Sequence, residues 1–338
     1  MNLRTLTEVR DVPLHATGMS DLERCPRYFL FRHRAGLVPK GRSSPALDRG
    51  TLLHLMIAER LRGKSQFEAE HAAHEQMRAQ SAAVSSQVGP NGYLPNGRTA
   101  EEAIKSIESN GLVAIAMARA FIKFFQVDKG RISGLTVPPG AVELKLPSGG
   151  KAGTLDAIGL DEKRGEYWIV DHKSCGIDAA LYARTLPLTA QTLIYPRLLD
   201  EASRIIDKPV VGICYNIIRT PTIRCSREDG YDLEKYAKRV EEVWYPNTPN
   251  ACLRTFIRPS AELVELSKPR LDRALAASVS LPVLSNFPAT GGSACTAYRS
   301  VCPFLDLCTR DTALWPDVLA RYDRDWRDEQ DETKDAEQ

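Results

Sequence analysis

The sequence of 338 residues predicts an α/β fold in which a mixed sheet is flanked by helices. Three short apolar segments, 141–146, 153–160 and 167–172, are separated by turns and have the character of consecutive strands. Residues 189–200 then have the pattern of a helix, and residues 209–218 form an apolar run that is typical of a buried strand. Three strands, a helix and a further strand therefore make up the expected core.

The remaining helices follow from apolar spacing and from capping residues. Ser20 is the expected N-cap of the first helix, because Glu23 follows it at the spacing of a capping box. Gly63 is a natural end for the second helix. The expected helices span residues 19–31, 48–62, 112–126, 231–243 and 260–277, and a polar helix lies within 64–110.

The composition predicts a soluble globular protein, with 43% hydrophobic and 26% charged residues. The formal net charge is only +2, so a contact with nucleic acid would need a local basic patch. The best candidate for a membrane span, residues 111–121, is too short and contains Arg119. The first twenty residues lack the layout of a secretory signal. We therefore expect a cytoplasmic protein that does not associate with membranes.

Five regions are expected along the chain. An N-terminal extension (1–18) precedes a helical region (19–135), which carries the first of the clustered cysteines. The sheet core (136–225) is followed by a region of helices and further cysteines (226–315). The last region, an acid-rich tail (316–338), is expected to be disordered.

Two carboxylates and a lysine flank the turn between the second and third expected strands. Asp171 and Lys173 are two residues apart, so they share one face of an extended chain, and His172 lies on the other. If the strands pair through the turn, Asp156 comes near Asp171. Two adjacent carboxylates repel each other, and burying them is costly unless a divalent cation compensates their charge. With a neighbouring ammonium, this set suits metal-assisted phosphodiester hydrolysis. The alternative is a surface hairpin with scattered charges, which the apolar run 168–170 disfavours.

Asp156 in Gly-Thr-Leu-Asp, followed by Asp171-His-Lys173 after an apolar strand, resembles motifs II and III of the RecB-like PD-(D/E)XK nucleases. The resemblance extends over most of the chain, from Cys25 to Cys308. It implies a restriction-endonuclease-like α/β core, a mixed sheet flanked by helices, that cleaves DNA with a metal ion.

Three further matches occur in the order expected for this family. A Gly-x-x-x-His motif ends at His54 and is similar to the upstream motif, whose histidine binds metal from a helix. Glu143 stands where the family often has an acidic residue, which would contact the metal. Gln191 and Tyr195, four residues apart on one helix face, resemble the helical motif near the scissile phosphate. Pro196 departs from the pattern, because proline should kink that helix.

Each of these residues also has an ordinary interpretation. His54 alone would be a hydrogen-bonded helix histidine, and Glu143 alone would be a salt-bridge residue. Gln191 and Tyr195 would be helix surface and core. The collinear order of the motifs favours the functional roles.

The resemblance assigns a role to each member of the set. Asp156, Asp171 and His54 would hold Mg²⁺ or Mn²⁺, with the His172 carbonyl as an additional ligand. Lys173 would position or activate the attacking water.

Four of the eight cysteines form a second pattern. Cys302 and Cys308, with Cys295 upstream and Cys25 near the start, resemble the iron–sulfur staple of AddB-type and certain CRISPR-associated nucleases. There, one cysteine before the nuclease core and three after it bind a 4Fe–4S cluster. The gap of six residues between Cys295 and Cys302 is longer than in those relatives. A zinc site or unliganded buried cysteines are the alternatives, and Cys214 is expected to be plain core.

A run of basic residues without acids lies between Arg24 and residue 42, interleaved with aromatic side chains. Basic groups alternating with aromatics suit the binding of a single strand or a duplex end. The alternative is that the aromatics form a core while the arginines are merely solvated. We expect a mixture, with DNA contacts from Arg24, Arg27, Arg32 and Arg34.

The expected activity is that of an exonuclease in recombination, repair or phage DNA processing. No ATPase motif is present, so a helicase, a recombinase or an annealing protein would be a separate partner. A CRISPR-associated nuclease that trims spacer precursors, a non-catalytic DNA-end-binding subunit and a zinc-stapled DNA-binding protein are the alternatives. The pattern leaves the oligomeric state open.

Overall fold

The computed structural model describes residues 9, 16–40, 45–89, 91–94, 98–146, 153–280, 287–299 and 301–324. Contacts divide the chain into two units. The sheet unit comprises the described residues between 45 and 266. The terminal unit comprises the described residues before 43 and after 266, so it is built from both ends of the chain.

The strands of the sheet unit form one seven-stranded sheet. They are β2 (Arg131–Ile132), β3 (Leu135–Thr136), β4 (Val142–Leu146), β5 (Gly153–Asp161), β6 (Glu166–Cys175), β7 (Val210–Arg219) and β8 (Cys252–Ile257). Their order is β2-β3-β5-β6-β7-β8, and β4 also pairs with β5. Only β6 and β7 run parallel among these pairs, so the predicted mixed sheet is confirmed. Both strands are apolar and mostly buried, which is typical of the centre of a sheet.

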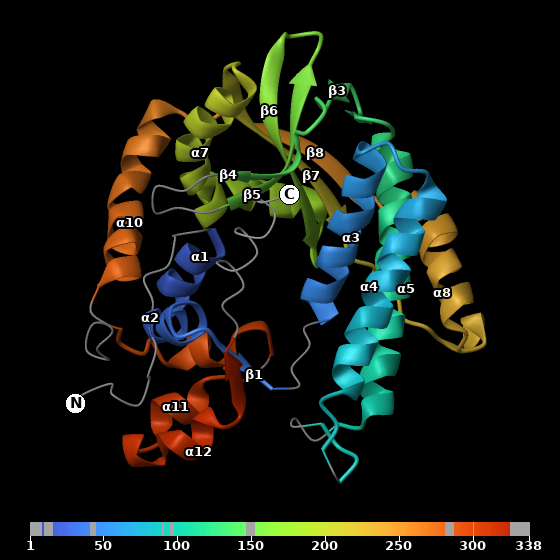
Figure 1. Cartoon of the computed structure of the whole chain (residues 1–338). Coiled ribbons are helices and arrows are strands. Elements are labelled where there is room, and N and C mark those ends of the chain that lie inside the picture. Colours follow the sequence, from blue (N-terminus) through green and yellow to red (C-terminus); the bar gives the residue numbers. More distant parts are fainter. Residues whose placement is uncertain are drawn as a thin grey trace, which may run out of the picture. The chain divides into compact units, whose positions relative to one another are not determined.

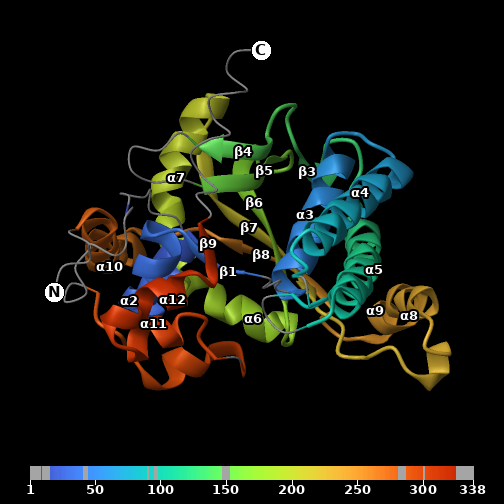
Figure 2. The same ribbon diagram turned by 60° about the horizontal axis from the view of Figure 1, so that its bottom comes forward.

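Helices cover this sheet from two sides. They are α3 (Pro45–Leu61), α4 (Gln66–Ser85), α5 (Ala100–Phe125), α6 (Ala179–Thr185), α7 (Ala190–Ile206), α8 (Leu233–Arg239) and α9 (Tyr245–Asn247). Figures 1 and 2 show α3, α4 and α5 on one side of the sheet and α7 on the other. The α3 helix contacts β4 and β6, while α6 and α7 contact β7 and form the crossover between the two parallel strands.

Capping residues explain where two of these helices begin. Ser65 caps α4 and Thr99 caps α5, and each is paired with a glutamate three residues later in a capping box. The α5 helix begins earlier than its apolar pattern predicts, because its first turns are polar and mostly exposed or half-buried. Its later turns are buried and pack along α3 and α4.

The terminal unit joins short elements from both ends of the chain. It contains α1 (Ala16–Arg24), α2 (Pro26–Phe29), a π-helical turn (Leu30–Arg34), β1 (Leu37–Pro39), most of α10 (Ala261–Val279), a 3-10 helix (Gly292–Arg299), α11 (Leu305–Thr309), α12 (Trp315–Leu319) and β9 (Tyr322–Arg324). The β1 and β9 strands pair antiparallel, with Leu37 opposite Arg324.

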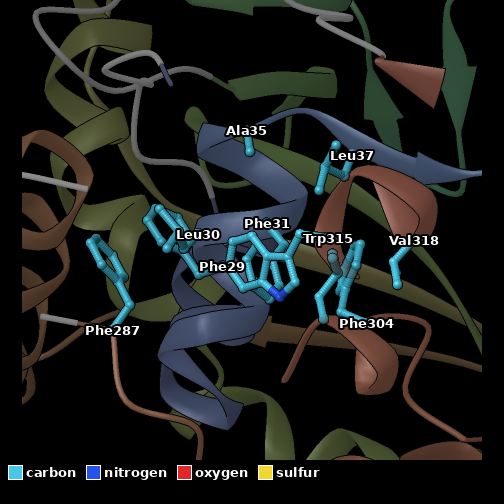
Figure 3. Packing of buried hydrophobic residues seen from close by; sticks show 10 residues of the cluster. Phe29, Leu30, Phe31, Ala35, Leu37, Phe287, Phe304, Trp315 and Val318 are labelled. Carbon is cyan, nitrogen blue, oxygen red and sulfur yellow. The ribbon is translucent and has the colours of Figure 1, made fainter. Parts of the chain in front are cut away.

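A buried aromatic cluster fills the terminal unit (Figure 3). The Phe31 ring lies 5.9 Å from the Trp315 ring and 5.6 Å from the Phe304 ring, measured between centroids. The two ends of the chain therefore share one hydrophobic core. Its ten buried members are Phe29, Leu30, Phe31, Ala35, Leu37, Phe287, Phe304, Leu307, Trp315 and Val318.

Two expectations about the first helix are wrong. The expected helix over 19–31 is broken at Cys25, whose backbone is extended (φ −160°, ψ 108°). The break has a local cause, because a residue before a proline, here Pro26, is disfavoured in the helical region. Ser20 lies inside α1, which begins at Ala16, so it is not an N-cap.

Other elements also differ from the sequence expectation. The β8 strand was not predicted, since it is only half-buried and has a charged residue at its centre. The segment 316–338 was expected to be a disordered tail, but it contains the β9 strand and all of α12 except its first residue. Residues 325–338 of that segment lie outside the described residues.

Candidate active site

The acidic residues converge at a point where the strands of the sheet begin to part. The β4 and β5 strands pair on either side of Glu143 and Asp156, which leaves these two residues opposite each other. The ladder between β5 and β6 ends at the pair Ala157–Val170, and the next positions on the two strands are Asp156 and Asp171. The sheet therefore brings three carboxylates onto three adjacent strands.

Glu143 has an unusual backbone conformation for a strand residue. Its φ is +53°, in the left-handed region that residues with a Cβ rarely adopt. Such local strain clusters at functional sites. Burial and the nearby Asp156 carboxylate raise the pKa of Glu143. A bound cation would relieve both unfavourable contributions.

His54 reaches the carboxylates from helix α3. Its Nδ1 lies 3.1 Å from Oδ1 of Asp156, and the backbone N–H of His172 donates to Oδ2 of Asp156 at 2.6 Å. Burial lowers the pKa of His54, but the Asp156 carboxylate outweighs this effect and leaves that pKa above its ordinary value. Burial raises the pKa of Asp156, but His54 and the Lys173 ammonium hold it well below its usual range.

Ligand atoms of His54, Glu143 and Asp156 all lie within 4.8 Å of one another. One imidazole nitrogen and two carboxylate oxygens are a suitable donor set for Mn²⁺ or Mg²⁺. These three of the predicted metal residues are therefore brought together. Asp171 is not in this group among the described residues.

Asp171 and Lys173 form a close ion pair on β6. Nζ of Lys173 lies 2.6 Å from Oδ2 of Asp171, and their side chains are 23% and 4% exposed respectively. Burial lowers the pKa of Lys173, but the Asp171 and Asp156 carboxylates outweigh it and raise that pKa above its ordinary value. Lys173 is consequently a cation and a hydrogen-bond donor at neutral pH.

The side chain of His172 belongs to a buried row that crosses three strands. Register places His172 on β6 beside Asn216 on β7, and Asn216 beside Arg254 on β8. Nε of Arg254 donates to Oδ1 of Asn216 at 2.7 Å, and Nδ2 of Asn216 lies 3.3 Å from Nδ1 of His172. Arginine only donates, so the amide orientation is fixed and the amide N–H faces the imidazole.

This row determines the protonation state of His172. Burial lowers the pKa of His172 to about 3, so the ring is neutral. Since Nδ1 accepts from Asn216, the single ring proton is on Nε2. The ring packs edge-to-face on Phe121, with 5.1 Å between centroids. Sequence patterns did not single out Asn216 or Arg254, because both look like ordinary strand residues.

A cleft of about 590 Å³ opens beside the metal group. One face of α3 forms a wall, and residues of β4 and β6 complete the lining. Substrate could therefore reach the carboxylates from this side. The lining residues are Gly50, Thr51, His54, Leu55, Ala58, Arg62, Glu143 and Ser174.

The predicted helical motif lies on α7. The backbone of Gln191 and Tyr195 is helical, and Pro196 does not end the helix, which continues to Ile206. The side chains of Gln191 and Tyr195 lie outside the described residues.

The four cysteines of the second pattern lie in the terminal unit. The backbone N–H of Cys302 donates to the carbonyl of Cys295 at 2.7 Å, which closes the long gap between them. Burial raises the pKa of the Cys302 thiol, and Cys295 and Cys25 are among the neighbours that raise it further. Burial likewise raises the pKa of Cys308 to about 11, with Cys302 and Cys25 as neighbours. The four cysteines therefore lie near one another in the terminal unit. Cys214 is fully buried in the sheet unit, as expected of core.

Arg34 is a core residue, which contradicts its expected contact with DNA. Arg34 is only 2% exposed. Its guanidinium donates to the carbonyls of Ala277 and Ser280 and lies 5.8 Å from the centre of the Phe287 ring. These contacts satisfy the charge inside the terminal unit and leave no surface for a phosphate.

The other three arginines are partly exposed. Arg24 forms an ion pair with Asp21 at 3.0 Å, and Nε of Arg27 donates to the carbonyl of Phe287 at 3.2 Å. Arg32 is half-buried. Phe29 and Phe31, which lie between them in the sequence, belong to the core, and Tyr28 packs against it. The expected DNA contacts of Arg24, Arg27 and Arg32 stay a prediction.

Comparison with known proteins gives one family. The model of the PD-(D/E)XK nuclease superfamily matches residues 14–309 of the chain, which include every residue of the site described above. No curated protein matches the chain. None of the helices in the described parts of the chain combines the length and apolar character that a membrane crossing needs.

Proposed function

The chain belongs to the PD-(D/E)XK nuclease superfamily, and from this membership we propose that it is a Mg²⁺- or Mn²⁺-dependent deoxyribonuclease. Membership itself implies a metal-dependent nuclease with a restriction-endonuclease-like α/β fold. The observation that carries the proposal is the meeting of His54, Glu143 and Asp156 beside the Asp171–Lys173 pair.

The donor set fits a divalent cation. His54, Glu143 and Asp156 would hold it, and Asp171 would join them when its carboxylate turns from Lys173. When bound, the cation polarises the phosphodiester and lowers the pKa of water. Asp156 is already held by its contacts to His54 and to the backbone of His172, so the ligand set can bind the cation without a large rearrangement.

Lys173 acts as a cation in this proposal. Because its pKa is raised, its ammonium donates hydrogen bonds to a phosphate oxygen or to the attacking water rather than removing a proton. Asp171 keeps the ammonium charged and oriented. Negative charge that develops on the phosphate during hydrolysis is thereby stabilised by a group already in position.

We further propose that the enzyme is a RecB/AddB-like exonuclease in the cytoplasm, acting in recombination, repair or phage DNA processing. The order of the motifs from His54 through Lys173 to Tyr195 supports this assignment. Its partner would be a recombinase, an annealing protein or a helicase, since the sequence has no ATPase motif of its own.

A 4Fe–4S cluster on Cys25, Cys295, Cys302 and Cys308 is part of the proposal. Four neighbouring thiols are the ligand set that such a cluster needs. In the described part of the chain, no three of their sulfur atoms lie within 4.8 Å of one another.

The test is digestion of end-labelled linear DNA and covalently closed circular DNA with Mg²⁺ or Mn²⁺. The protein is purified without air, and wild type is compared with Lys173→Ala. Cleavage of linear but not circular DNA, with a loss of at least about a hundredfold in the variant, supports the proposal.

Other outcomes would contradict particular parts of it. Equal activity in wild type and Lys173→Ala would mean that the site is wrong or that a contaminant cuts the DNA. Cleavage of closed circles would contradict exonuclease action while keeping the nuclease. No cleavage by a folded wild-type protein would point to a DNA-binding subunit.

A further inference from the structure

The cleft beside the metal group runs along one face of α3. Gly50, His54, Ala58 and Arg62 line it at intervals of four residues, so they form a continuous row on the helix. The backbone N–H of Arg62 donates to the carbonyl of Ala58 at 2.9 Å, which extends the helical turn to Arg62. Eight residues separate His54 from Arg62, a distance of about 12 Å along a helix axis.

Arg62 is the basic residue of this lining. Its side chain is 42% exposed and forms an ion pair with Glu59, three residues earlier, at 2.7 Å. Exposed pairs of this kind contribute little, so a phosphate can compete for the guanidinium. Arg62 and Glu143 both line the cleft.

Among the described residues that line the cleft there is no phenylalanine, tyrosine or tryptophan. Proteins that hold bases of a single strand usually stack them on aromatic rings. Small side chains at Gly50, Ala58 and Ser174 instead leave room for a chain of sugars and phosphates. The cleft has a volume of about 590 Å³, which corresponds to a sphere about 10 Å across. A B-DNA duplex is wider than this, since its major groove alone is ~12 Å wide.

We propose that this cleft is the track of one DNA strand, which is held by its sugar–phosphate backbone and not by its bases. Arg62 binds a phosphate two to three nucleotides from the bond that is cut. That number follows from the ~12 Å between His54 and Arg62, since a strand advances about 3.4 Å per nucleotide in a duplex and more when extended. The inference rests on the proposed nuclease function and adds how the substrate is held.

The first experiment measures the salt dependence of binding. A fluorescein-labelled oligothymidine is titrated with wild type, Arg62→Ala and Arg62→Lys in the presence of Ca²⁺. The KCl concentration is varied from about 50 to about 300 mM, a range over which counterion release can be measured. Arg78→Ala is the matched control, because Arg78 forms an i,i+3 ion pair with Glu75 on α4 and does not line the cleft.

Loss of one phosphate contact lowers the slope of log K against log[salt] by about 0.7 for a single strand. We expect this change in Arg62→Ala, and we expect slopes like that of wild type in Arg62→Lys and Arg78→Ala. In cleavage assays Arg62→Ala raises KM several-fold and leaves kcat within about twofold, because uniform binding is lost. An unchanged slope in a folded Arg62→Ala, verified by its thermal unfolding, overturns the inference.

The second experiment removes the bases. An oligonucleotide in which the three nucleotides beside the cut are abasic is compared with the intact strand. We expect kcat/KM within about threefold, whereas stacked bases would contribute about five- to a hundredfold each. A loss of more than tenfold overturns binding through the backbone.

Failure of the inference and failure of the proposed function give different results. If wild type neither binds nor cleaves DNA, the nuclease proposal itself is wrong. If wild type cleaves DNA and the Arg62→Ala slope equals that of Arg78→Ala, only the role of Arg62 is wrong. If duplex DNA binds and is cut as tightly and as fast as a single strand of the same sequence, the single-strand track is wrong.

Discussion

Nδ1 of His54 lies 3.1 Å from Oδ1 of Asp156, a contact that joins helix α3 to strand β5 at the candidate metal group. The other oxygen of Asp156 is held by the backbone N–H of His172. The carboxylate is thus oriented from two sides in the ion-free protein. Below the raised pKa of His54, a metal ion that enters the group would displace a proton from His54 rather than order a loose side chain.

Metal affinity should therefore depend on pH through His54. Burial lowers its pKa, but Asp156 raises it by more, so the folded pKa lies above the unfolded one. The ion-free protein gains stability from this pair below pH ~6.5 and loses it as pH rises through the folded pKa. Metal binding has the opposite sign, because it needs neutral imidazole. Mn²⁺ affinity should rise about tenfold per pH unit below the folded pKa.

Calorimetric titration of Mn²⁺ between pH ~5.5 and ~8.5 checks this expectation, since the range brackets the ordinary histidine pKa. His54→Gln should bind Mn²⁺ at least tenfold more weakly and lose this pH dependence. The same pH dependence in wild type and variant would show that another group carries the proton.

The Asp171–Lys173 pair should show strong energetic coupling. Lys173→Met removes the cation that pairs with the almost fully buried Asp171 carboxylate, and Asp171→Asn removes the carboxylate that pairs with the Lys173 ammonium. Each should lower the free energy of unfolding by about 2–3 kcal/mol, which is below the ~3–5 of a fully buried pair because Lys173 keeps some exposure. The double variant should be close to wild type in stability and inactive. Urea unfolding measures this, and additive single effects would contradict the coupling.

The buried row of His172, Asn216 and Arg254 should hold the ring proton on Nε2. In ¹⁵N spectra of labelled histidine, Nδ1 of His172 should have the shift of an unprotonated nitrogen at neutral pH. Asn216→Leu removes partners from both neighbours and should destabilise the protein by about 1–3 kcal/mol. A protonated Nδ1 in wild type would refute the assigned hydrogen-bond directions.

The cysteine proposal makes a prediction about colour. Protein purified without air should be brown, and Cys25→Ser, Cys302→Ser or Cys308→Ser should lose the visible absorbance and bound iron. Cys214→Ser is the matched control, because Cys214 is buried in the sheet unit and should leave the cluster intact. Stoichiometric zinc without iron in the wild-type protein would decide for the zinc alternative.

Two glycines should respond differently to the same substitution. In Gly212→Ala, the new Cβ on β7 would lie 2.5 Å from the carbonyl oxygen of Ile257 and 2.8 Å from the Trp168 ring. Backbone must move, so we expect a loss of about 1–3 kcal/mol. In Gly111→Ala in α5, the three atoms nearest to the new Cβ all belong to the flexible Met77 side chain, and the substitution gains helix propensity, so it should be nearly neutral. Thermal unfolding of both variants tests this, and equal losses would contradict it.

The four strands β4 to β7 and the carboxylates on them could be predicted from the sequence for a simple reason. Asp156 and Asp171 are equally distant from the centre of the turn between their strands, so antiparallel pairing must bring them together. Apolar runs before Asp171 and on β7 identified the buried strands. Features that depend on residues close together in the sequence could therefore be predicted from it.

Contacts between segments that are distant in the sequence could not be predicted from it. Asn216 and Arg254 meet because of the register between β7 and β8, which no local pattern sets. Arg34 belongs to a basic run that is typical of a surface, yet carbonyls at Ala277 and Ser280 satisfy it in the interior. A side chain whose partners lie more than two hundred residues away cannot be assigned from its own surroundings in the sequence.

The discontinuity of the terminal unit has a consequence for biosynthesis. Its first segment leaves the ribosome well before its last, and the 224 residues from 43 to 266 lie between them. At about 5–20 residues per second, the N-terminal helices wait about 10–45 s for the segments that complete their core. The sheet unit can fold during that delay. A chain interrupted in its last seventy residues would then hold a formed candidate active site with Phe29 and Phe31 uncovered, which would mark the incomplete product for degradation.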